Sequence, residues 1–266
     1  IHMICGLIDP TRGRISIAGD AGRPLSPATK RRLGLVPQDF AFYPSLTARD
    51  NLAFFGRIFG LTGNHLVSRI DAVLGVAQLR DRDCEPVTGF SSGMKRRLNI
   101  AIALLHQPDI LVLDEPTVGV DAQSRSAILE TLQQLNRSGT TLIYSTHYME
   151  EAERLCSRLA IMDHGRVIAL DSPRELVRSL AAGLIEVQLG ATAGPEFLTR
   201  LGHLGAVRVT DASGTVITVR AAQPEAVLAE LISLVHASGL PIRGLRLLDA
   251  NLEAVFLTLT GRKLRD

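Results

Sequence analysis

The stretch that decides the fold runs from Ile110 to Gly119 and reads ILVLDEPTVG. Four apolar residues lead directly into two adjacent carboxylates, Asp114 and Glu115. A short apolar run of this kind predicts a buried strand. Negative charge beside a buried strand is unfavourable unless something binds it, and a metal ion with a reacting phosphate would do so. A second reading is that the two carboxylates only cap the segment that follows.

Helices and strands alternate on both sides of this stretch. Before it, Gly93 opens a helical pattern whose apolar residues recur at i, i+3, i+4 and i+7 from Leu98 to Leu105. Such alternation favours an α/β core with a mainly parallel sheet. The residues Ile1 to Leu7 look like the tail of an amphipathic helix that ends at Gly6. The other elements predicted in this part of the chain are strands over 15–17, 33–36 and 141–145, helical segments over 46–79 and 122–136, a short acidic helix after 147, and a hairpin over 158–169.

The pattern changes after about residue 183. Strand and helix signals there follow the order βαββαβ, which is the ferredoxin-like arrangement. A last helix over 251–260 closes the chain. The predicted elements are strands over 184–189, 206–210, 215–219 and 242–248, and helices over 195–204 and 224–238.

Composition limits the function classes that fit. The chain has 266 residues, 46% of them hydrophobic, so a sizeable core can form. The net charge of +2 argues against a nucleic-acid binder with a strongly basic surface. Three widely separated cysteines show neither zinc-ligand spacing nor a disulfide framework. No apolar run approaches the length of a membrane span, so we expect any link to a membrane to go through a partner.

Polar side chains stand at the ends of several predicted strands. Gln38 follows the strand over 33–36, Asp114 and Glu115 end the strand in the opening stretch, and His147 follows the strand over 141–145. In open α/β sheets ligands gather beyond the carboxyl ends of strands, so neighbouring strands would bring these residues together. A carboxylate such as Asp114 is a suitable Mg²⁺ ligand. Glu115 is placed to activate a water molecule, which fits phosphoryl transfer.

Each signal also has a structural reading. Ser91 opens the helix after Phe90, and a serine with exposed N–H groups behind it is an anion site or only an N-cap. His147 alone is more often a structural histidine, and Gln38 alone carries almost no information. The run Lys95-Arg96-Arg97 is expected to form a solvated helix face.

The combination is far more specific than its parts, and it resembles the ATP-binding cassette (ABC) family. Phe90 to Met94 looks like the signature motif usually written LSGGQ, and Ile110 to Asp114 looks like the Walker B strand. Glu115 matches the catalytic glutamate, and His147 matches the switch histidine. The Q-loop and the D-loop are matched by Gln38 and by Val118-Gly119-Val120-Asp121. The motifs occur in family order, and the match covers roughly residues 1 to 175.

The resemblance implies an architecture. It implies a P-loop NTPase-like α/β core, incomplete at its N-terminus, over residues 1–180, with an α-helical signature subdomain over about 46–98. We expect a small α+β, ferredoxin-like accessory domain over 183–266. The tail from Asn251 to Asp266, the extra domain before it, and the MKRR sequence after the signature look like the ABC-2-type exporter subfamily.

The resemblance also implies roles for particular residues. The cofactors would be ATP and Mg²⁺, with Glu115 and His147 catalytic and with Asp114 and Gln38 on the metal. The residues expected to contact the nucleotide are Gln38, Ser91, Ser92, Gly93, Met94 and Asp121.

The partners implied are a second nucleotide-binding subunit, in a homodimer, and a separate transmembrane permease. The coupling helix of that permease would dock near Gln38 and the residues from Asp39 to Pro44, so the protein would sit at the cytoplasmic face of the cell membrane. Phe42 and Tyr43 have a second reading as core residues. Two rivals stay open: an ABC ATPase acting in DNA maintenance or translation, and a fragment that serves only as an interaction module.

Two features depart from the family pattern. No G-x-x-x-x-G-K-[ST] run is present, because Lys30, Lys95 and Lys263 are followed by Arg, Arg and Leu. We therefore expect the P-loop to lie upstream of Ile1 in a longer parent. This chain alone would then bind ATP weakly or not at all, whereas the parent would hydrolyse it. Ser92 stands where the family usually has Gly, and we expect impairment at most.

Overall fold

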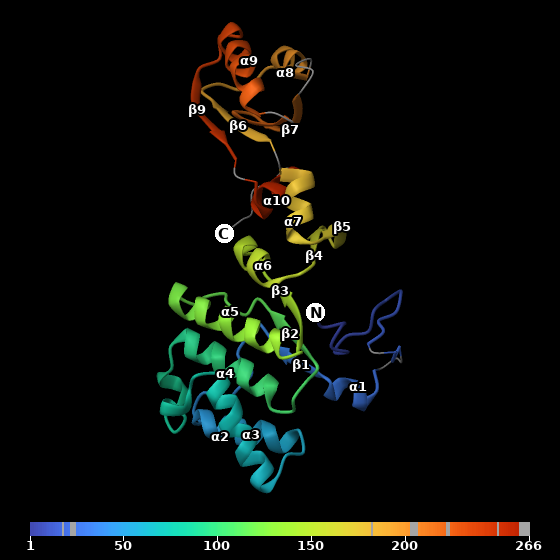
Figure 1. Cartoon of the computed structure of the whole chain (residues 1–266), viewed down its shortest axis with the longest axis vertical. Coiled ribbons are helices and arrows are strands. Elements are labelled where there is room, and N and C mark those ends of the chain that lie inside the picture. Colours follow the sequence, from blue (N-terminus) through green and yellow to red (C-terminus); the bar gives the residue numbers. More distant parts are fainter. Residues whose placement is uncertain are drawn as a thin grey trace. The chain divides into compact units, whose positions relative to one another are not determined.

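The computed structural model describes residues 1–17, 19–21, 25–181, 183–202, 207–221, 224–248 and 250–260. The chain divides into two compact units, Ile1–His147 and Tyr148–Asp266 (Figure 1). All the strand ends discussed above, through His147, belong to the first unit.

A parallel sheet forms the centre of the first unit. Its strands β1 (Leu33–Val36), β2 (Ile110–Asp114) and β3 (Thr141–Ser145) are hydrogen-bonded in the order β1-β2-β3. All the pairings are parallel. Three consecutive residues of β2, Leu111, Val112 and Leu113, are fully buried, which is why the strand has a continuous hydrophobic sequence rather than an alternating pattern. The predicted α/β core is confirmed for these strands, and their carboxyl ends lie at one edge.

Helices surround this sheet, and Figure 1 shows α2, α3 and α4 gathered together in the first unit. The helical pattern expected over 46–79 forms two helices, Ala48–Ile58 and Gly63–Val76. Gly60 has a φ of +85°, and the N–H of Leu61 donates to the carbonyl of Gly56, so a left-handed glycine closes the first helix. The helices are α1 (Pro27–Arg31), α2 (Ala48–Ile58), α3 (Gly63–Val76), α4 (Ser92–Leu104) and α5 (Ala122–Arg137), with 3₁₀ turns η1 (Arg80–Arg82) and η2 (Val87–Gly89).

The first residues form a turn that ends at Gly6, as expected for the tail of a helix. The N–H of Gly6 donates to the carbonyl of Met3, that of Leu7 donates to the carbonyl of His2, and Gly6 has a φ of +66°. The strand predicted over 15–17 is wrong. Among the described residues, Ile17 pairs with Asp20 in an isolated antiparallel bridge, and no strand includes residues 15–17.

The second unit begins with a short helix and a hairpin. The last helix packs with these elements: the N–H of Leu252 donates to Glu153 at 2.7 Å, and Leu252 and Val255 share a buried cluster with Ala152 and Leu176. The elements are α6 (Met149–Leu155), β4 (Leu159–Asp163), β5 (Arg166–Asp171), α7 (Pro173–Leu176), a π-helical turn η3 (Val177–Ala181) and α10 (Leu252–Thr260).

An antiparallel sheet of order β7-β8-β6-β9 forms the rest of the second unit. Its elements follow one another as β6-α8-β7-β8-α9-β9, the order expected from the sequence. A buried cluster joins the sheet to its helices, with Ile185, Val187 and Val219 from the strands and Phe197 and Leu231 from the helices. The bounds are β6 (Leu184–Leu189), α8 (Pro195–Gly202), β7 (Val207–Ser213), β8 (Val216–Ala221), α9 (Pro224–Ala237) and β9 (Ile242–Leu247); residues 203–206 of the predicted elements lie outside the described residues.

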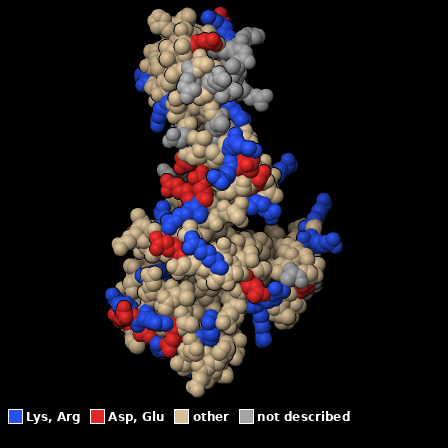
Figure 2. Space-filling model, viewed as in Figure 1, with Lys and Arg blue, Asp and Glu red and all other residues tan. Residues whose placement is uncertain are grey.

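The described surface carries charges of both signs. Figure 2 shows Lys and Arg interspersed with Asp and Glu on the viewed face, without a continuous basic area. Among the described helices, none has the length and apolar character needed to cross a membrane.

Candidate active site

Three strand ends meet at the carboxylate of Glu115. Gln38, just after β1, donates from Nε2 to Glu115 Oε2 at 3.3 Å. His147, just after β3, places Nδ1 at 3.3 Å from Glu115 Oε1. The side chains of Glu115 and His147 are 30% and 37% exposed, so the group is open to solvent. The structure therefore brings together three of the predicted site residues, each oxygen of Glu115 facing a different partner.

Ser145 joins the two carboxylates, and the sequence did not single it out. The register of β2 and β3 pairs Asp114 with Ser145. The Ser145 hydroxyl donates to Asp114 Oδ1 at 2.7 Å and accepts from the Glu115 N–H at 3.0 Å. The sequence does show a hydroxyl residue at the end of the next strand, which could have indicated a site residue. Only the register of the two strands, however, shows that Ser145 lies opposite Asp114.

The backbone at Glu115 is strained. Its φ is +44°, in the left-handed region that few non-glycine residues adopt. The N–H of Glu115 is held by the hydroxyl of Ser145 and by its carbonyl, at 3.0 and 3.2 Å. Strain of this kind persists where the surroundings fix it, and it is concentrated at functional sites. The chain thus leaves the sheet directly after Asp114.

The signature residues form a second group at the start of α4. Ser91 accepts a hydrogen bond from the Met94 N–H at 3.2 Å. It therefore acts as the N-cap of α4, which is the structural role predicted for it. A Cβ on Gly93 would stand 2.4 Å from Ser124 Oγ, so only glycine allows α4 to approach α5 this closely. Ser91 and Ser92 are exposed.

Asp121 belongs to this second group. It caps α5 by accepting from the Ser124 N–H at 2.9 Å, and this hydrogen bond lowers the pKa of Asp121. Ser91 and Asp121 accept hydrogen bonds from the first turns of α4 and α5, whereas Gln38 and His147 both face the Glu115 carboxylate. The predicted site residues therefore form two groups, one at the strand ends and one at the helix starts.

The basic run after the signature corrects an expectation. Lys95-Arg96-Arg97 was expected to be a solvated face, but Arg96 is only 3% exposed and faces the loop after β1. Arg97 donates to the carbonyls of Ala77 and Gln78, at the end of α3. Both arginines bond to backbone carbonyls, and their spacing on the helix turns them toward different neighbours.

The donor set fits Mg²⁺ only in part. No cluster of three or more His, Cys, Asp or Glu side chains suited to a metal occurs in the described part of the chain. Mg²⁺ commonly takes one or two carboxylates and completes its shell with water and substrate phosphates, and Asp114 meets that requirement. Gln38 directs its Nε2 to Glu115, so its amide oxygen is not the atom that donates there and could serve as a second oxygen ligand. The phosphate-binding glycine-lysine loop is not among the 266 residues.

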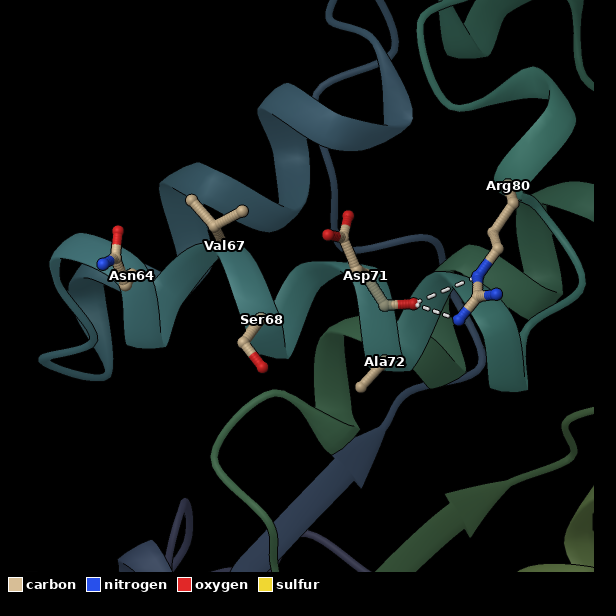
Figure 3. A pocket seen from close by; sticks show the side chains of 6 residues that line it. All are labelled: Asn64, Val67, Ser68, Asp71, Ala72 and Arg80. Carbon is tan, nitrogen blue, oxygen red and sulfur yellow. Dashed lines mark hydrogen bonds between the residues drawn. The ribbon is translucent and has the colours of Figure 1, made fainter.

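A surface hollow lies away from both groups of predicted site residues. A space of about 520 Å³, open to solvent, lies along α3 and η1 (Figure 3). Arg80 there donates to the carbonyl of Asp71 at 3.2 Å and is therefore already engaged. None of the predicted site residues lines this hollow, whose lining is Asn64, Val67, Ser68, Asp71, Ala72 and Arg80.

Comparisons with known proteins show which family and which named proteins the chain is similar to. The family described as ABC transporter matches residues 1–118. Linearmycin resistance ATP-binding protein LnrL of Bacillus subtilis is 42% identical over 270 residues, which cover 100% of this chain and 86% of that protein. Nod factor export ATP-binding protein I of Ralstonia nicotianae is 40% identical over 269 residues, covering 100% of this chain and 82% of that protein.

Two solved structures extend the similarity to the fold. The dimeric, post-hydrolysis ATP-binding cassette MJ0796 bound to ADP and Pi has a TM-score of 0.58 and 27% identity, covering 64% of this chain and 78% of its own. The cbiO1 protein of Clostridium perfringens, part of the complex cbiONQ, has a TM-score of 0.61 and 27% identity, covering 67% and 73%.

Proposed function

This chain belongs to the ABC transporter family as an ATP-binding protein, and from that premise we propose that it is the ATP-hydrolysing subunit of an exporter. The observation that carries the proposal is the meeting of Gln38 and His147 at the Glu115 carboxylate. Relatives with different named cargoes, linearmycin resistance and Nod factor export, are similarly close, so the similarity supports export without selecting a cargo.

The proposed chemistry depends on where Glu115 is held. Hydrogen bonds on both sides fix its two carboxylate oxygens, and Ser145 fixes its backbone. A carboxylate fixed in this way is a general base that accepts a proton from an attacking water. His147 and Gln38 orient that base, and Asp114, held by Ser145, presents an oxygen to a cation. Mg²⁺-ATP, when bound, supplies the phosphoryl group, and its Mg²⁺ neutralises the negative charge of the phosphates.

The proposed partners are a second copy of the subunit and a separate membrane permease, at the cytoplasmic membrane face. Exposed aromatic side chains follow Gln38, with Phe40 and Tyr43 at 42% and 49% exposure, and Phe54 of α2 stands beside Tyr43 with ring centroids 5.0 Å apart. Tyr43 is thus not a core residue. An apolar surface of this kind fits an amphipathic helix of a permease.

Co-expression with a candidate permease tests the proposed function. The test uses a version of the chain to which a P-loop segment has been joined before Ile1, called the extended protein below. We expect it to co-purify with the permease and to hydrolyse ATP. Tyr43→Ala should weaken the co-purification, whereas Val67→Ala, at a 52% exposed position on α3, should not. Co-purification with ribosomes or DNA instead of a membrane protein would contradict the proposal.

For the 266 residues alone we expect weak ATP binding. The family holds the phosphates with backbone N–H groups and a lysine, and no lysine here is followed by Ser or Thr. Calorimetric titration with a non-hydrolysable ATP analogue should show no binding below about millimolar concentrations. The extended protein is the positive control, and a submillimolar dissociation constant for the chain alone would refute the expectation.

Ser92 offers a second test in the extended protein. It is exposed at the first residue of α4, where the family usually has Gly. A side chain here would crowd a phosphate approaching from a second subunit, so Ser92→Gly should leave turnover unchanged or raise it by a factor of about two, which corresponds to a few tenths of a kcal/mol. A large loss of steady-state ATPase activity would show that the hydroxyl itself is required.

A further proposal concerns the domain organisation of the C-terminal part of the chain. We propose that residues 183–266 act as an accessory domain attached to an ABC core that ends near residue 180. The β7-β8-β6-β9 sheet and its own buried cluster support a separate module. The packing of α10 with α6 and α7 ties the last helix to the segment before that sheet.

A further inference from the structure

The loop that carries Gln38 is bonded to the middle of α4. The carbonyl of Pro37 accepts from Arg96 Nη1 at 2.9 Å and from Asn99 Nδ2 at 3.2 Å. The N–H of Ala41 donates to Asn99 Oδ1 at 3.3 Å. Three hydrogen bonds from two side chains on α4 therefore hold both ends of the segment from Pro37 to Ala41.

Arg96 makes this attachment in an unusually buried position. It is 3% exposed, and the carbon at the centre of its guanidinium lies 5.0 Å from the centroid of the Phe40 ring. Burial lowers the pKa of Arg96, with the charge of Asp39 opposing that effect. Its Nε finds no acceptor among the described residues. A buried guanidinium is unfavourable unless its contacts are specific, and here they are made to a single loop.

We propose that Arg96 and Asn99 are positioning residues that hold Gln38 against Glu115. Because they stand on α4, they also link its Ser91 end to the catalytic carboxylate. The inference rests on the function proposed above, since it concerns how that site is kept in order.

The geometry explains why the link works. Gln38 directly follows Pro37, so displacing the Pro37 carbonyl displaces the Gln38 side chain that donates to Glu115. A helix of 13 residues transmits a shift at its first turn to its middle with little loss. Misplacement of a catalytic group by about 1 Å can cost about a hundredfold in rate. A modest loosening of the loop is therefore enough to slow the reaction.

Arg97 provides a matched control on the same helix. It is partly buried, burial lowers its pKa as it lowers that of Arg96, and it too donates to backbone carbonyls. Its acceptors, however, are at the end of α3 rather than on the Gln38 loop. Arg96→Met and Arg97→Met thus remove the same charge from adjacent positions, and only the first should free the loop.

The first experiment needs no catalysis. The chain contains no tryptophan, so Phe40→Trp introduces a single fluorescent reporter on the loop. In this background Arg96→Met should red-shift the emission and increase acrylamide quenching, and Arg97→Met should do neither. Unchanged emission in the Arg96 variant, with circular dichroism showing a folded chain, would overturn the attachment whether or not the protein hydrolyses ATP.

The second experiment measures coupling in the extended protein. Arg96→Met should lower kcat about tenfold. Arg96→Lys keeps the charge but not the planar donors, so its kcat should lie between that of Arg96→Met and that of the extended protein. Combined with Gln38→Ala, Arg96→Met should lower kcat no further, because it acts through Gln38. An undiminished tenfold loss in the double variant would show that Arg96 acts independently. If the extended protein without these substitutions shows no turnover, the proposed function fails, and the fluorescence result still decides the loop attachment.

Discussion

Glu115→Gln is expected to lower ATP turnover of the extended protein by about 10²–10⁴-fold. The amide keeps the shape of the side chain but removes its ability to accept a proton from water. The amide also has one acceptor oxygen where the carboxylate has two, and Gln38 and His147 each face a different carboxylate oxygen. Steady-state phosphate release measures the loss. Equilibrium binding of ATP should be retained, since the carboxylate is placed to act on water.

Glu85→Gln is the matched control for this substitution. Glu85 is also partly exposed, at 46%, and also has a nearby partner, Arg82 at 2.6 Å. It lies outside both groups of site residues, so its substitution should leave turnover within about twofold, because surface changes away from such sites have small effects. Turnover of the Glu115 variant equal to that of the Glu85 variant would remove Glu115 from the proposed mechanism.

Asn51→Leu is expected to destabilise the chain by about 2–4 kcal/mol. Asn51 is fully buried on α2. Its Oδ1 accepts from the Tyr43 N–H at 2.8 Å, and its Nδ2 donates to the carbonyls of Tyr43 and Thr47, both at 2.9 Å. Leucine fills a similar volume but leaves these backbone groups without their partner. Urea unfolding followed by circular dichroism gives the change in free energy.

The same variant tests how the aromatic surface is held. Because Asn51 fixes Tyr43, its loss should also weaken co-purification of the extended protein with the permease, even at temperatures where the chain stays folded. Asn64→Leu, at an exposed position on α3, should change stability by no more than about 0.5 kcal/mol and leave co-purification intact. Equal urea midpoints for the two leucine variants would contradict this view of Asn51.

Elements with strong local signals were predictable from the sequence. The apolar run of β2 and the helical periodicity of α4 gave boundaries within one or two residues of those observed. Ser91 and Asp121 precede α4 and α5 and act as N-caps in both cases, which is local hydrogen bonding. The strand predicted over 15–17 failed because a short β-rich run becomes a strand only if another strand pairs with it.

For the carboxylate group of the candidate site, the sequence predicted the residues that stand at the ends of the strands. Topology places the carboxyl ends of parallel strands at one edge, and this rule led from the sequence to Gln38, Glu115 and His147. Ser145 was missed because its role depends on the register with Asp114. Arg96 was misjudged because a basic run beside exposed serines resembles a solvated face. Its burial comes from a loop far away in the sequence.

The sequence by itself determined the alternation of helices and strands, the caps that begin α4 and α5, and the family motifs, because each depends on neighbouring residues. The tertiary structure alone decided that Ser145 lies between the two carboxylates, that Gln38 and His147 face opposite oxygens of Glu115, and that Arg96 is buried against Pro37. Those contacts join residues up to 77 positions apart. They depend on the register and packing of several elements at once, which no local pattern specifies.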